Sequence, residues 1–289
     1  MLRRLIIGLG IFVLATGNVQ FNNFADTSCG KRKITSRYGK IVGGENAIKG
    51  EFPWLVSLTR RGGHVCGGTV ISKKFILTAG HCLCTGLNQG IFKPAALKVT
   101  MSQYDLTIKN SEAYQMNVKA ITIHPGYVCS QPKDDIAILE LEKVIHWSDS
   151  VGPACLPSGE ESQAARNFVT VAGWGWTHED SSKGQRATIL QKAKLSLINM
   201  RDCREWYASQ GKDIKIQDSH ICAGYKQGEI DACWGDSGGP LMSNIDKNGN
   251  QTIVIGVVST GIGCARPYLP GLYTRISDYI SWIQKTIQK

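Results

Sequence analysis

A serine between glycines carries the clearest chemical signal in this sequence. Residues 235–240 read Gly-Asp-Ser-Gly-Gly-Pro, so the hydroxyl of Ser237 is uncrowded by neighbouring side chains. A serine hydroxyl is a weak nucleophile near neutral pH unless a base takes its proton. Because a glycine-rich serine turn is more often only a turn, the interpretation depends on partners elsewhere in the chain.

Two upstream runs offer those partners. Residues 77–82 lead from an apolar stretch to His81, and residues 134–139 begin with two aspartates before the apolar run Ile-Ala-Ile-Leu. A neutral imidazole, with a reference pKa of ~6.5, could accept the serine proton and later return it. Of the two aspartates, we favour Asp135 as the partner because it directly precedes the apolar run, and we expect Asp134 to be a solvated neighbour.

The elements that must position these residues are short strands. Apolar runs rich in β-branched residues are separated by glycine, proline, asparagine or aspartate, which is typical of an all-β protein. The clearest runs are residues 75–78, 98–101, 136–141, 168–172 and 252–258.

The C-terminal segment has a different pattern. Its isoleucines recur every three to four residues, which predicts an amphipathic helix with one face toward the core. The hydroxyl of Ser277 could cap the beginning of this helix. The isoleucines are Ile276, Ile280, Ile283 and Ile287.

Composition and charge limit the possible classes of protein. The chain has 289 residues, enough for one large domain or two small ones, and its 42% hydrophobic content excludes disorder throughout. The formal net charge of +10 falls to +4 when residues 1–40 are left out. Since no concentrated basic stripe remains, we do not expect a nucleic-acid partner.

The beginning of the chain indicates its compartment. Residues 1–4 are basic and residues 5–17 form an apolar run that ends in small residues, which is typical of a secretory signal peptide. The alternative is a retained membrane anchor, which needs ~20 apolar residues. We therefore expect a secreted, extracellular protein without stable membrane insertion. Asn250, in the sequon Asn-Gln-Thr, could carry an N-glycan.

Ten cysteines in a secreted chain predict disulfides. The alternative is a metal site, because His81, Cys82 and Cys84 are close in sequence. The paired spacing that zinc ligands usually show does not occur. We expect neither a metal nor another cofactor.

With these residues identified, the sequence resembles the trypsin-like (chymotrypsin-fold) serine endopeptidases, in which histidine, aspartate and serine follow in this order. The resemblance runs from Ile41 to the C-terminal helix. It implies an all-β fold of two packed antiparallel six-stranded β-barrels with a C-terminal α-helix. The barrels would span roughly residues 41–156 and 157–289.

The resemblance also implies a catalytic triad of His81 as base, Asp135 as orienting acid and Ser237 as nucleophile. In this family the N–H groups at the positions of Gly235 and Ser237 form the oxyanion hole.

Substrate selection is implied by the residues just before Ser237. Asp231 matches the base of the family's primary pocket, and Gly261 and Gly271 match walls that admit a long cation. An entering Arg or Lys would gain a charge-assisted contact with the carboxylate. Ala232 lacks a hydroxyl that could help to solvate an ammonium, so we expect Arg to be preferred over Lys. Ser259 completes the implied substrate-binding set.

An activation site is implied upstream. The run Ile41-Val-Gly-Gly-Glu is similar to the family's mature N-terminus, and Lys40 before it supplies a tryptic cleavage point. Cleavage would free an ammonium on Ile41 that pairs with Asp236 and orders the oxyanion loop and the pocket. Residues 18–40 would then be an activation segment, or light chain.

The resemblance implies most of the disulfides as well. Cys29 and Cys155 would keep the light chain attached after activation. The two cysteines that remain, Cys84 and Cys129, stand close to His81 and Asp135, so we expect their loops to meet near the cleft. The full set is Cys29–Cys155, Cys66–Cys82, Cys84–Cys129, Cys203–Cys222 and Cys233–Cys264.

Several residues depart from the family's pattern. Thr260 stands where relatives usually carry tryptophan, which removes an aromatic platform for the substrate. Trp234 is bulkier than the usual residue, and it either shades the pocket entrance or lies on its rim. Val169 and Ser243 replace a further disulfide, and Gln103 replaces an acidic ligand of the family's calcium loop.

The implied function is that of a secreted serine endopeptidase, made as a zymogen, that cleaves after Arg and Lys. Its partners would be protein or peptide substrates, an activating protease and protein protease inhibitors. Two other classes compete with this interpretation. A catalytically silent homologue that acts as a binding module usually lacks a triad member, and an extracellular structural or carbohydrate-binding β domain would not need the activation motif.

Overall fold

The computed structural model describes ten segments of the chain. They are residues 21–22, 24–25, 27–32, 44–86, 90–108, 112–129, 131–158, 167–180, 182–244 and 251–288. The expected signal peptide, the activation bond between Lys40 and Ile41, and the sequon residue Asn250 lie outside these segments.

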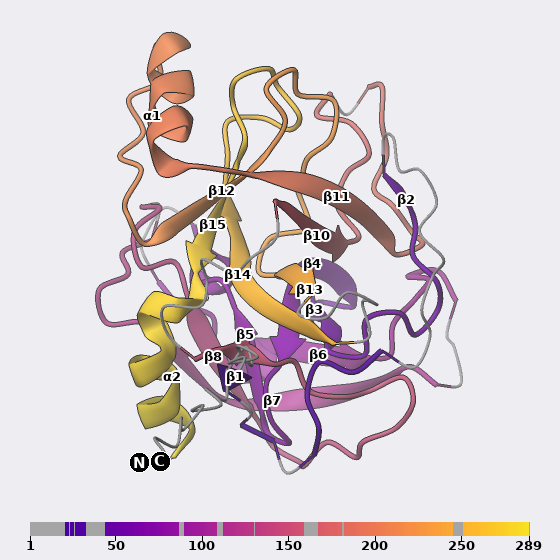
Figure 1. Ribbon diagram of the computed structural model, residues 1–289. Helices are drawn as coiled ribbons and strands as arrows, with labels where there is room; N and C mark the ends of the chain where they lie inside the picture. The colour runs from indigo at the N-terminus through magenta and orange to yellow at the C-terminus, as the bar shows by residue number, and fades with distance from the viewer. Residues whose placement is uncertain are drawn as a thin grey trace, which may run out of the picture.

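The first half of the chain forms a closed antiparallel barrel of six strands, drawn in purple and magenta in Figure 1. Two of the apolar runs, 75–78 and 136–141, lie in neighbouring strands of this barrel. In barrel order the strands are β3 (Leu55–Arg60), β4 (Gly63–Val70), β5 (Phe75–Thr78), β8 (Ala137–Leu141), β7 (Tyr114–Ile123) and β6 (Leu97–Met101).

The second half forms another six-stranded antiparallel barrel, which pairing between β10 and β11 closes. The short β2 (Glu45–Asn46) adds to the edge of β11. In barrel order the strands are β10 (Phe168–Gly173), β13 (Pro240–Asn244), β14 (Thr252–Thr260), β15 (Gly271–Arg275), β12 (His220–Gly224) and β11 (Gln191–Ile198). The predicted fold class is therefore confirmed.

Short helices and one small strand pair complete the described structure. β1 (Phe21–Asn22) pairs with β9 (Leu156–Pro157), and α1 (Met200–Ser209) stands at the outer end of the second barrel. The sequence interpretation missed α1, although Asn199 caps it by accepting a hydrogen bond from the Asp202 N–H at 2.8 Å. The 3-10 turns are η1 (His81–Leu83), η2 (Pro94–Ala96) and η4 (Ile276–Tyr279).

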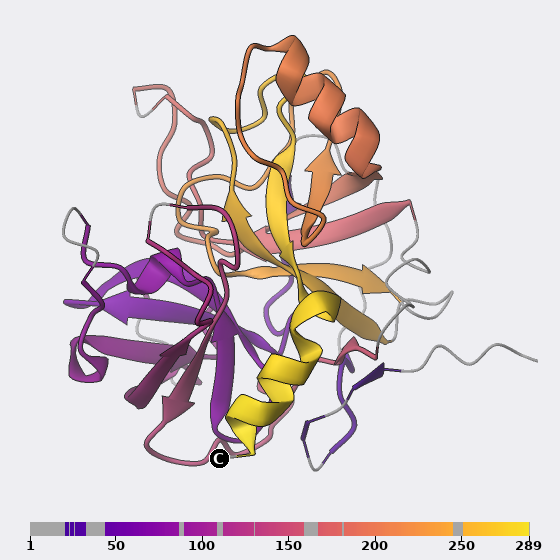
Figure 2. The same cartoon turned by 90° about the vertical axis from the view of Figure 1, so that its left-hand side faces the viewer.

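The predicted C-terminal helix is present as α2 (Ile280–Ile287), and Figure 2 shows it beside strands of the first barrel. Ile276 and Ile283 are fully buried, whereas Ile280 and Ile287 pack against the core from its edge. The expected cap is wrong: Ser277 lies in the preceding 3-10 turn and donates to Asp278. The α-helix begins only after that turn, its N-cap residue is Tyr279, and no side chain caps it.

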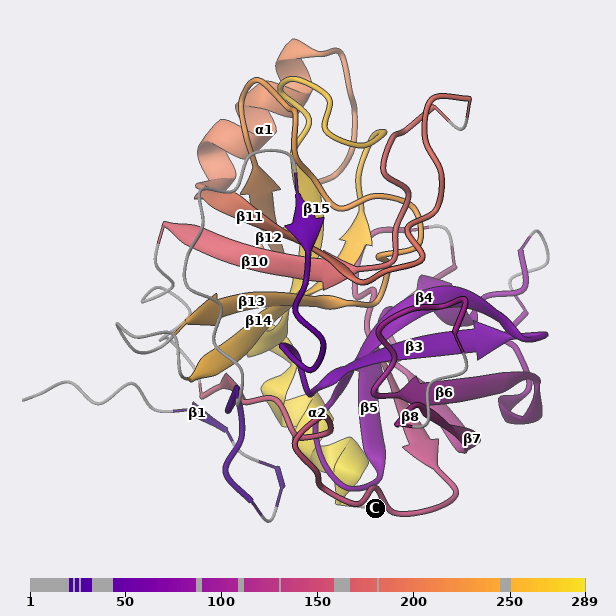
Figure 3. The same cartoon turned by 90° about the vertical axis from the view of Figure 1, so that its right-hand side faces the viewer.

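The two barrels lie one above the other in Figure 3, and the largest buried cluster contains residues from both. At their junction the Gly67 N–H donates to the Ser237 carbonyl at 2.7 Å. A Cβ on Gly67 would stand 2.9 Å from the Gly239 Cα, so only glycine lets the two backbones approach this closely. The loop that carries Ser237 is thereby held against the first barrel.

Candidate active site

Strand pairing brings His81 and Asp135 together. β5 and β8 are antiparallel neighbours, and Thr78 at the end of β5 lies opposite Ala137 at the beginning of β8. The chain continues from Thr78 into η1, which begins at His81, while Asp135 stands two residues before β8. Residues 54 positions apart in sequence thus meet at one edge of the first barrel.

The Asp135 carboxylate holds the imidazole by two contacts. One oxygen lies 2.7 Å from His81 Nδ1, and the other accepts the His81 backbone N–H at 2.8 Å. The Ser259 hydroxyl donates to the first oxygen at 2.5 Å. Burial opposes ionisation, but the His81 charge and these hydrogen bonds outweigh it, so the pKa of Asp135 lies below its usual value. An ionised Asp135 favours the tautomer with the proton on Nδ1, which leaves Nε2 able to accept one.

The contact with Asp135 also sets the pKa of His81. Burial lowers the pKa of His81, but the negative charge and hydrogen bond of Asp135 raise it more, and the net shift is upward from 6.5. A third of the His81 side chain remains exposed, toward the cleft, whereas Asp135 is buried. His81 is therefore a base of raised pKa that solvent or a ligand can reach.

Asp134 has a different role from the one expected. Its side chain is only 13% exposed, and it accepts a hydrogen bond from the Tyr279 hydroxyl at 2.8 Å. The expectation of a solvated neighbour is thus wrong, because the C-terminal segment covers this carboxylate. Asp134 fastens that segment to the first barrel.

Ser237 lines the same cleft as His81 and Asp135, a cavity of about 770 Å³ between the barrels. The loop that carries Ser237 is braced by backbone hydrogen bonds from Asp236 N–H to the Cys233 carbonyl and from Gly239 N–H to the Asp236 carbonyl, both at 2.9 Å. The structure therefore gathers an alcohol, an imidazole and a carboxylate at one cavity.

The loop just before Ser237 has a support that the sequence did not indicate. His64 in β4 contacts the Gly235 carbonyl through Nε2 at 2.8 Å and the Ser57 hydroxyl through Nδ1 at 2.8 Å. Burial lowers the pKa of His64 to about 4, against the opposing effect of the Gly235 hydrogen bond. A neutral His64 thus orients the Gly235 peptide from 171 residues away.

Asp231 and Gly271 line one part of the same cleft, which we call the slot. Asp231 accepts the N–H groups of Ala232 at 2.8 Å and Ala265 at 3.3 Å. Burial, only partly opposed by these two bonds, raises the pKa of Asp231 to about 7. Gly271 keeps the slot open, because a Cβ there would stand 2.8 Å from a carboxylate oxygen of Asp231.

A family model described as Trypsin matches residues 41–283. The chain belongs to the trypsin family. It is also 36% identical over 261 residues to the Suppressor of tumorigenicity 14 protein homolog of Bos taurus. That alignment covers 90% of this chain and 29% of the bovine protein, so the chain spans less than a third of its relative's length.

Two of the residues that depart from the trypsin family's pattern, Trp234 and Thr260, line the cleft. Trp234 is 54% exposed and lines the cleft, so it forms part of the rim. Thr260, at the end of β14, lines the cleft with Gly261. The Ser259 side chain turns away from the slot to Asp135. Tyr127 also lines the cleft, although the sequence interpretation did not single it out.

Disulfides tie the site together, and the structure forms the same five pairs that the sequence interpretation gives. Cys66–Cys82 joins β4 to the turn of His81, and Cys84–Cys129 joins the loops beside His81 and Asp135. The full set is Cys29–Cys155, Cys66–Cys82, Cys84–Cys129, Cys203–Cys222 and Cys233–Cys264.

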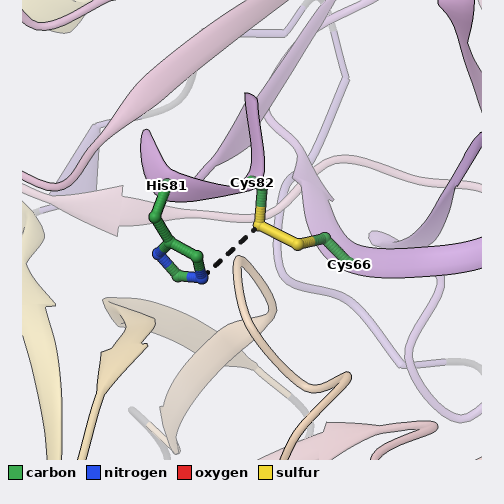
Figure 4. Close-up of side chains that lie close together, drawn as sticks. All are labelled: Cys66, His81 and Cys82. Carbon is green, nitrogen blue, oxygen red and sulfur yellow. Dashed lines mark hydrogen bonds between the residues drawn. A yellow bond between two sulfur atoms is a disulfide. The ribbon is translucent and has the colours of Figure 1, made fainter. Parts of the chain in front are cut away.

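One group of metal-ligand side chains is clustered within the described segments. It comprises Cys66, His81 and Cys82, and Figure 4 shows the His81 ring beside the disulfide, with Nε2 3.9 Å from the Cys82 sulfur. A disulfide sulfur carries no thiolate, the form of cysteine that binds metal. This cluster therefore does not fit a metal ion.

A second cavity has a volume of about 450 Å³, and both Gly44 and Asp236 line it. The Asp236 carboxylate accepts the N–H groups of Gly175 at 2.7 Å and Cys233 at 2.9 Å. Burial, opposed by these hydrogen bonds, raises the pKa of Asp236 above its usual value. A buried carboxylate of this kind is suited to pairing with a cation.

Proposed function

We propose that this member of the trypsin family is a serine endopeptidase that cleaves peptide bonds after Arg and Lys. The observation that carries the proposal is that Asp231, a partly buried acidic residue, lines the same cleft as His81, Asp135 and Ser237. A nucleophile and its base beside an acidic slot provide for both the reaction and the choice of substrate.

In the proposed mechanism, His81 Nε2 takes the Ser237 proton as the hydroxyl attacks the scissile carbonyl. Asp135 stabilises the imidazolium that forms, through the 2.7 Å contact with Nδ1. The N–H groups of Gly235 and Ser237 stabilise the oxyanion, and loss of one such donor raises the activation free energy by ~3–4 kcal/mol. His81 then protonates the leaving amine, and water hydrolyses the acyl-enzyme by the same route.

Substrate preference follows from the chemistry of the slot. Burial of Asp231 without a cation is unfavourable, so an entering guanidinium or ammonium recovers free energy by pairing with it. A guanidinium matches a carboxylate with two parallel hydrogen bonds. Because Ala232 offers no hydroxyl to help solvate a compact ammonium, we propose that Arg is preferred over Lys.

We further propose that the enzyme is made as a zymogen and activated by cleavage after Lys40. The cavity that both Gly44 and the Asp236 carboxylate line supports this proposal, because Gly44 lies three residues after Ile41. The new ammonium of Ile41 would pair with Asp236 and lower its pKa, which stabilises the neighbouring oxyanion loop. The activating protease is a separate enzyme that cleaves after a basic residue.

We also keep the proposed organisation of the chain: a signal peptide over residues 1–17, a light chain over residues 18–40 and a peptidase domain over residues 41–289. The Cys29–Cys155 disulfide supports a light chain that remains attached after cleavage. Secretion is consistent with five disulfides, which form in oxidising compartments. Within the described segments, no helix is long and apolar enough to cross a bilayer.

Short chromogenic substrates with Arg, Lys or Leu at the cleaved bond test this proposal. The chain cut after Lys40 should hydrolyse the Arg substrate fastest and the Leu substrate slowest, and the uncut chain should be nearly inactive. Ser237→Ala should abolish turnover. Binding of substrate-like peptides without any turnover by the cut chain would instead indicate a silent homologue.

A matched pair of glycine variants tests the slot itself. Gly271→Ala adds a methyl group 2.8 Å from Asp231 and should lower kcat/KM on Arg substrates about ten-fold or more. In Gly261→Ala, the nearest described atoms would lie at 3.7 Å, an ordinary contact, so the loss should be smaller. Equal losses for both variants would argue against Asp231 as the floor of the slot.

A further inference from the structure

A third cavity lies away from the cleft, on the outer surface of the first barrel. Its volume is about 510 Å³, within the ~300–1,000 Å³ typical of pockets that hold ligands. It is formed where the turn between β3 and β4 approaches β6 and the 3-10 turn η2. Neither the triad nor the acidic slot contributes a residue to it.

Three cations line this cavity, and we call Arg60, Arg61 and Lys98 the basic surface. Arg60 ends β3, Arg61 begins the turn to β4, and Lys98 lies in β6 opposite Thr59 of β3. Antiparallel pairing thus fixes the three charges side by side on one sheet. Arg61 and Lys98 are exposed.

Among the described residues, no acidic side chain compensates this charge locally. The cavity lining contains no aspartate or glutamate, and none of the three cations forms an ion pair with a described residue. By contrast, Lys119 on the neighbouring β7 is paired with Glu140 at 2.6 Å. Uncompensated charge of one sign around a hollow attracts a partner of the opposite sign.

The cavity also has an apolar side. The Arg60 guanidinium lies 4.3 Å from the centre of the Phe92 ring, and Ala95 and Ala96 line the wall beside it. Apolar contact next to cations suits a peptide that alternates carboxylates with an aromatic or aliphatic side chain. It suits a sulfated polysaccharide less, because such a chain offers charge with little apolar surface.

β4 connects the basic surface to the catalytic loop. It runs from the turn at Gly62 to Gly67, whose N–H donates to the Ser237 carbonyl. Five strand residues at ~3.3 Å each span about 16 Å. One substrate chain could therefore occupy both places, with about five extended residues between the cleaved bond and the basic surface.

We propose that the basic surface docks an acidic segment of the protein substrate and so selects among proteins that share a basic cleavage site. This inference rests on the proposed endopeptidase activity and adds a second recognition element to it. Because each exposed ion pair is weak, docking should lower KM only about ten-fold and leave kcat nearly unchanged.

Matched peptide substrates test the proposal. Each contains one Arg cleavage site and, about five residues away on either side, a segment rich in Glu around one Phe. The control replaces each Glu by Gln. The cut enzyme should show a KM about ten-fold lower for the Glu peptide in at least one of the two orientations, and the advantage should shrink as salt is added.

Charge-reversal variants locate the effect. The double variant Arg61→Glu/Lys98→Glu should remove the KM advantage of the Glu peptide. The control Lys143→Glu/Lys285→Glu makes the same change of net charge at exposed sites outside the cavity, so it should keep the advantage. Arg60 is left in place because it packs on Phe92. Unchanged kcat on a short Arg substrate shows that the variants are folded.

The outcomes separate this inference from the proposed function. If the short Arg substrate is cleaved but the Glu and Gln peptides have equal KM, the proposed docking is wrong. It is also wrong if the Glu peptide keeps its lower KM with the Arg61→Glu/Lys98→Glu variant, because the acidic segment then does not dock on the basic surface. If the short substrate is not cleaved at all, the endopeptidase proposal fails. Fluorescence anisotropy of a labelled Glu peptide with the Ser237→Ala protein then still measures whether the peptide binds the basic surface. Binding of a heparin oligosaccharide without binding of that peptide would assign the surface to a polysaccharide and overturn the proposal.

Discussion

At the scale of single residues, the site is governed by how burial acts on three carboxylates. Asp135 stays ionised because His81 and Ser259 bond to it, whereas burial dominates at Asp231 and Asp236 and raises their pKa. We propose that each of the latter two pairs with a cation: Asp231 with the side chain of the substrate, and Asp236 with the new N-terminus.

The raised pKa of His81 predicts where activity falls in acid. The base must be neutral, so kcat should drop as pH falls through a midpoint above ~6.5. The profile of kcat is the right one to measure, because it reports the complex, in which a bound cation already keeps Asp231 ionised. A midpoint clearly below 6.5, or a flat profile to low pH, would exclude His81 paired to Asp135 as the base.

The pKa of Asp231, about 7 in the empty slot, predicts proton release on binding a cation. A cation pairs with the ionised form, so below ~pH 7 the carboxyl must first lose its proton, and Kd should rise about ten-fold per pH unit. Calorimetry of benzamidine binding in buffers of different ionisation enthalpy measures both effects. Asp231→Asn should bind weakly without pH dependence, and a pH-independent Kd for the unmutated protein would contradict the account.

At this scale the sequence singled out three residues that the structure brings to one cleft, but it did not indicate the residues that support them. His81, Asp135 and Ser237 stand in a recognisable order, because each lies in a local motif. His64 has no such motif: it matters only because β4 passes the Gly235 loop, a contact between residues from two different barrels. Asp134 was misjudged for the same reason, since its partner Tyr279 is 145 residues away.

At the scale of elements, β11 is fastened to the segment before the first barrel by a buried ion pair. Lys192 lies 2.8 and 3.0 Å from the two carboxylate oxygens of Glu51, and 3.1 Å from Glu45. Lys192 and Glu51 are almost wholly buried. Strand runs could be located from their apolar pattern, but this cross-link could not, because nothing local marks either residue as buried.

Lys192→Met should therefore be costly, because it leaves the Glu51 carboxylate buried without its main cation. We expect a loss of about 3 kcal/mol in the free energy of unfolding, measured by urea denaturation. Lys194→Met in the same strand is the control, since Lys194 only stacks on the exposed Phe168 ring and should contribute less than ~1 kcal/mol. Equal losses for the two variants would show that the ion pair does not fasten β11.

At the scale of the whole molecule, residues from two closed barrels line one cleft. The first barrel supplies His81 and Asp135, and the second supplies Ser237 and the slot. The close approach of Gly67 and Gly239 at the junction could not be predicted from the sequence, because it depends on how the two barrels pack.

The Cys29–Cys155 disulfide predicts how the molecule behaves after activation. It joins residues on opposite sides of Lys40, and Gly30 bonds to the Pro153 carbonyl at 2.8 Å beside it. Cut protein should migrate as one species on a gel without reductant and as two with it. Release of the light chain without reductant would mean that the disulfide does not tether it.

The central claim is that Ser237 becomes a nucleophile beside a slot that accepts cations. A fluorophosphonate probe tests it most directly, by mass mapping of the covalent adduct on the chain cut after Lys40. We expect one adduct, on Ser237, that benzamidine slows and His81→Ala abolishes. An adduct on another residue, or none on the cut chain, would contradict the account.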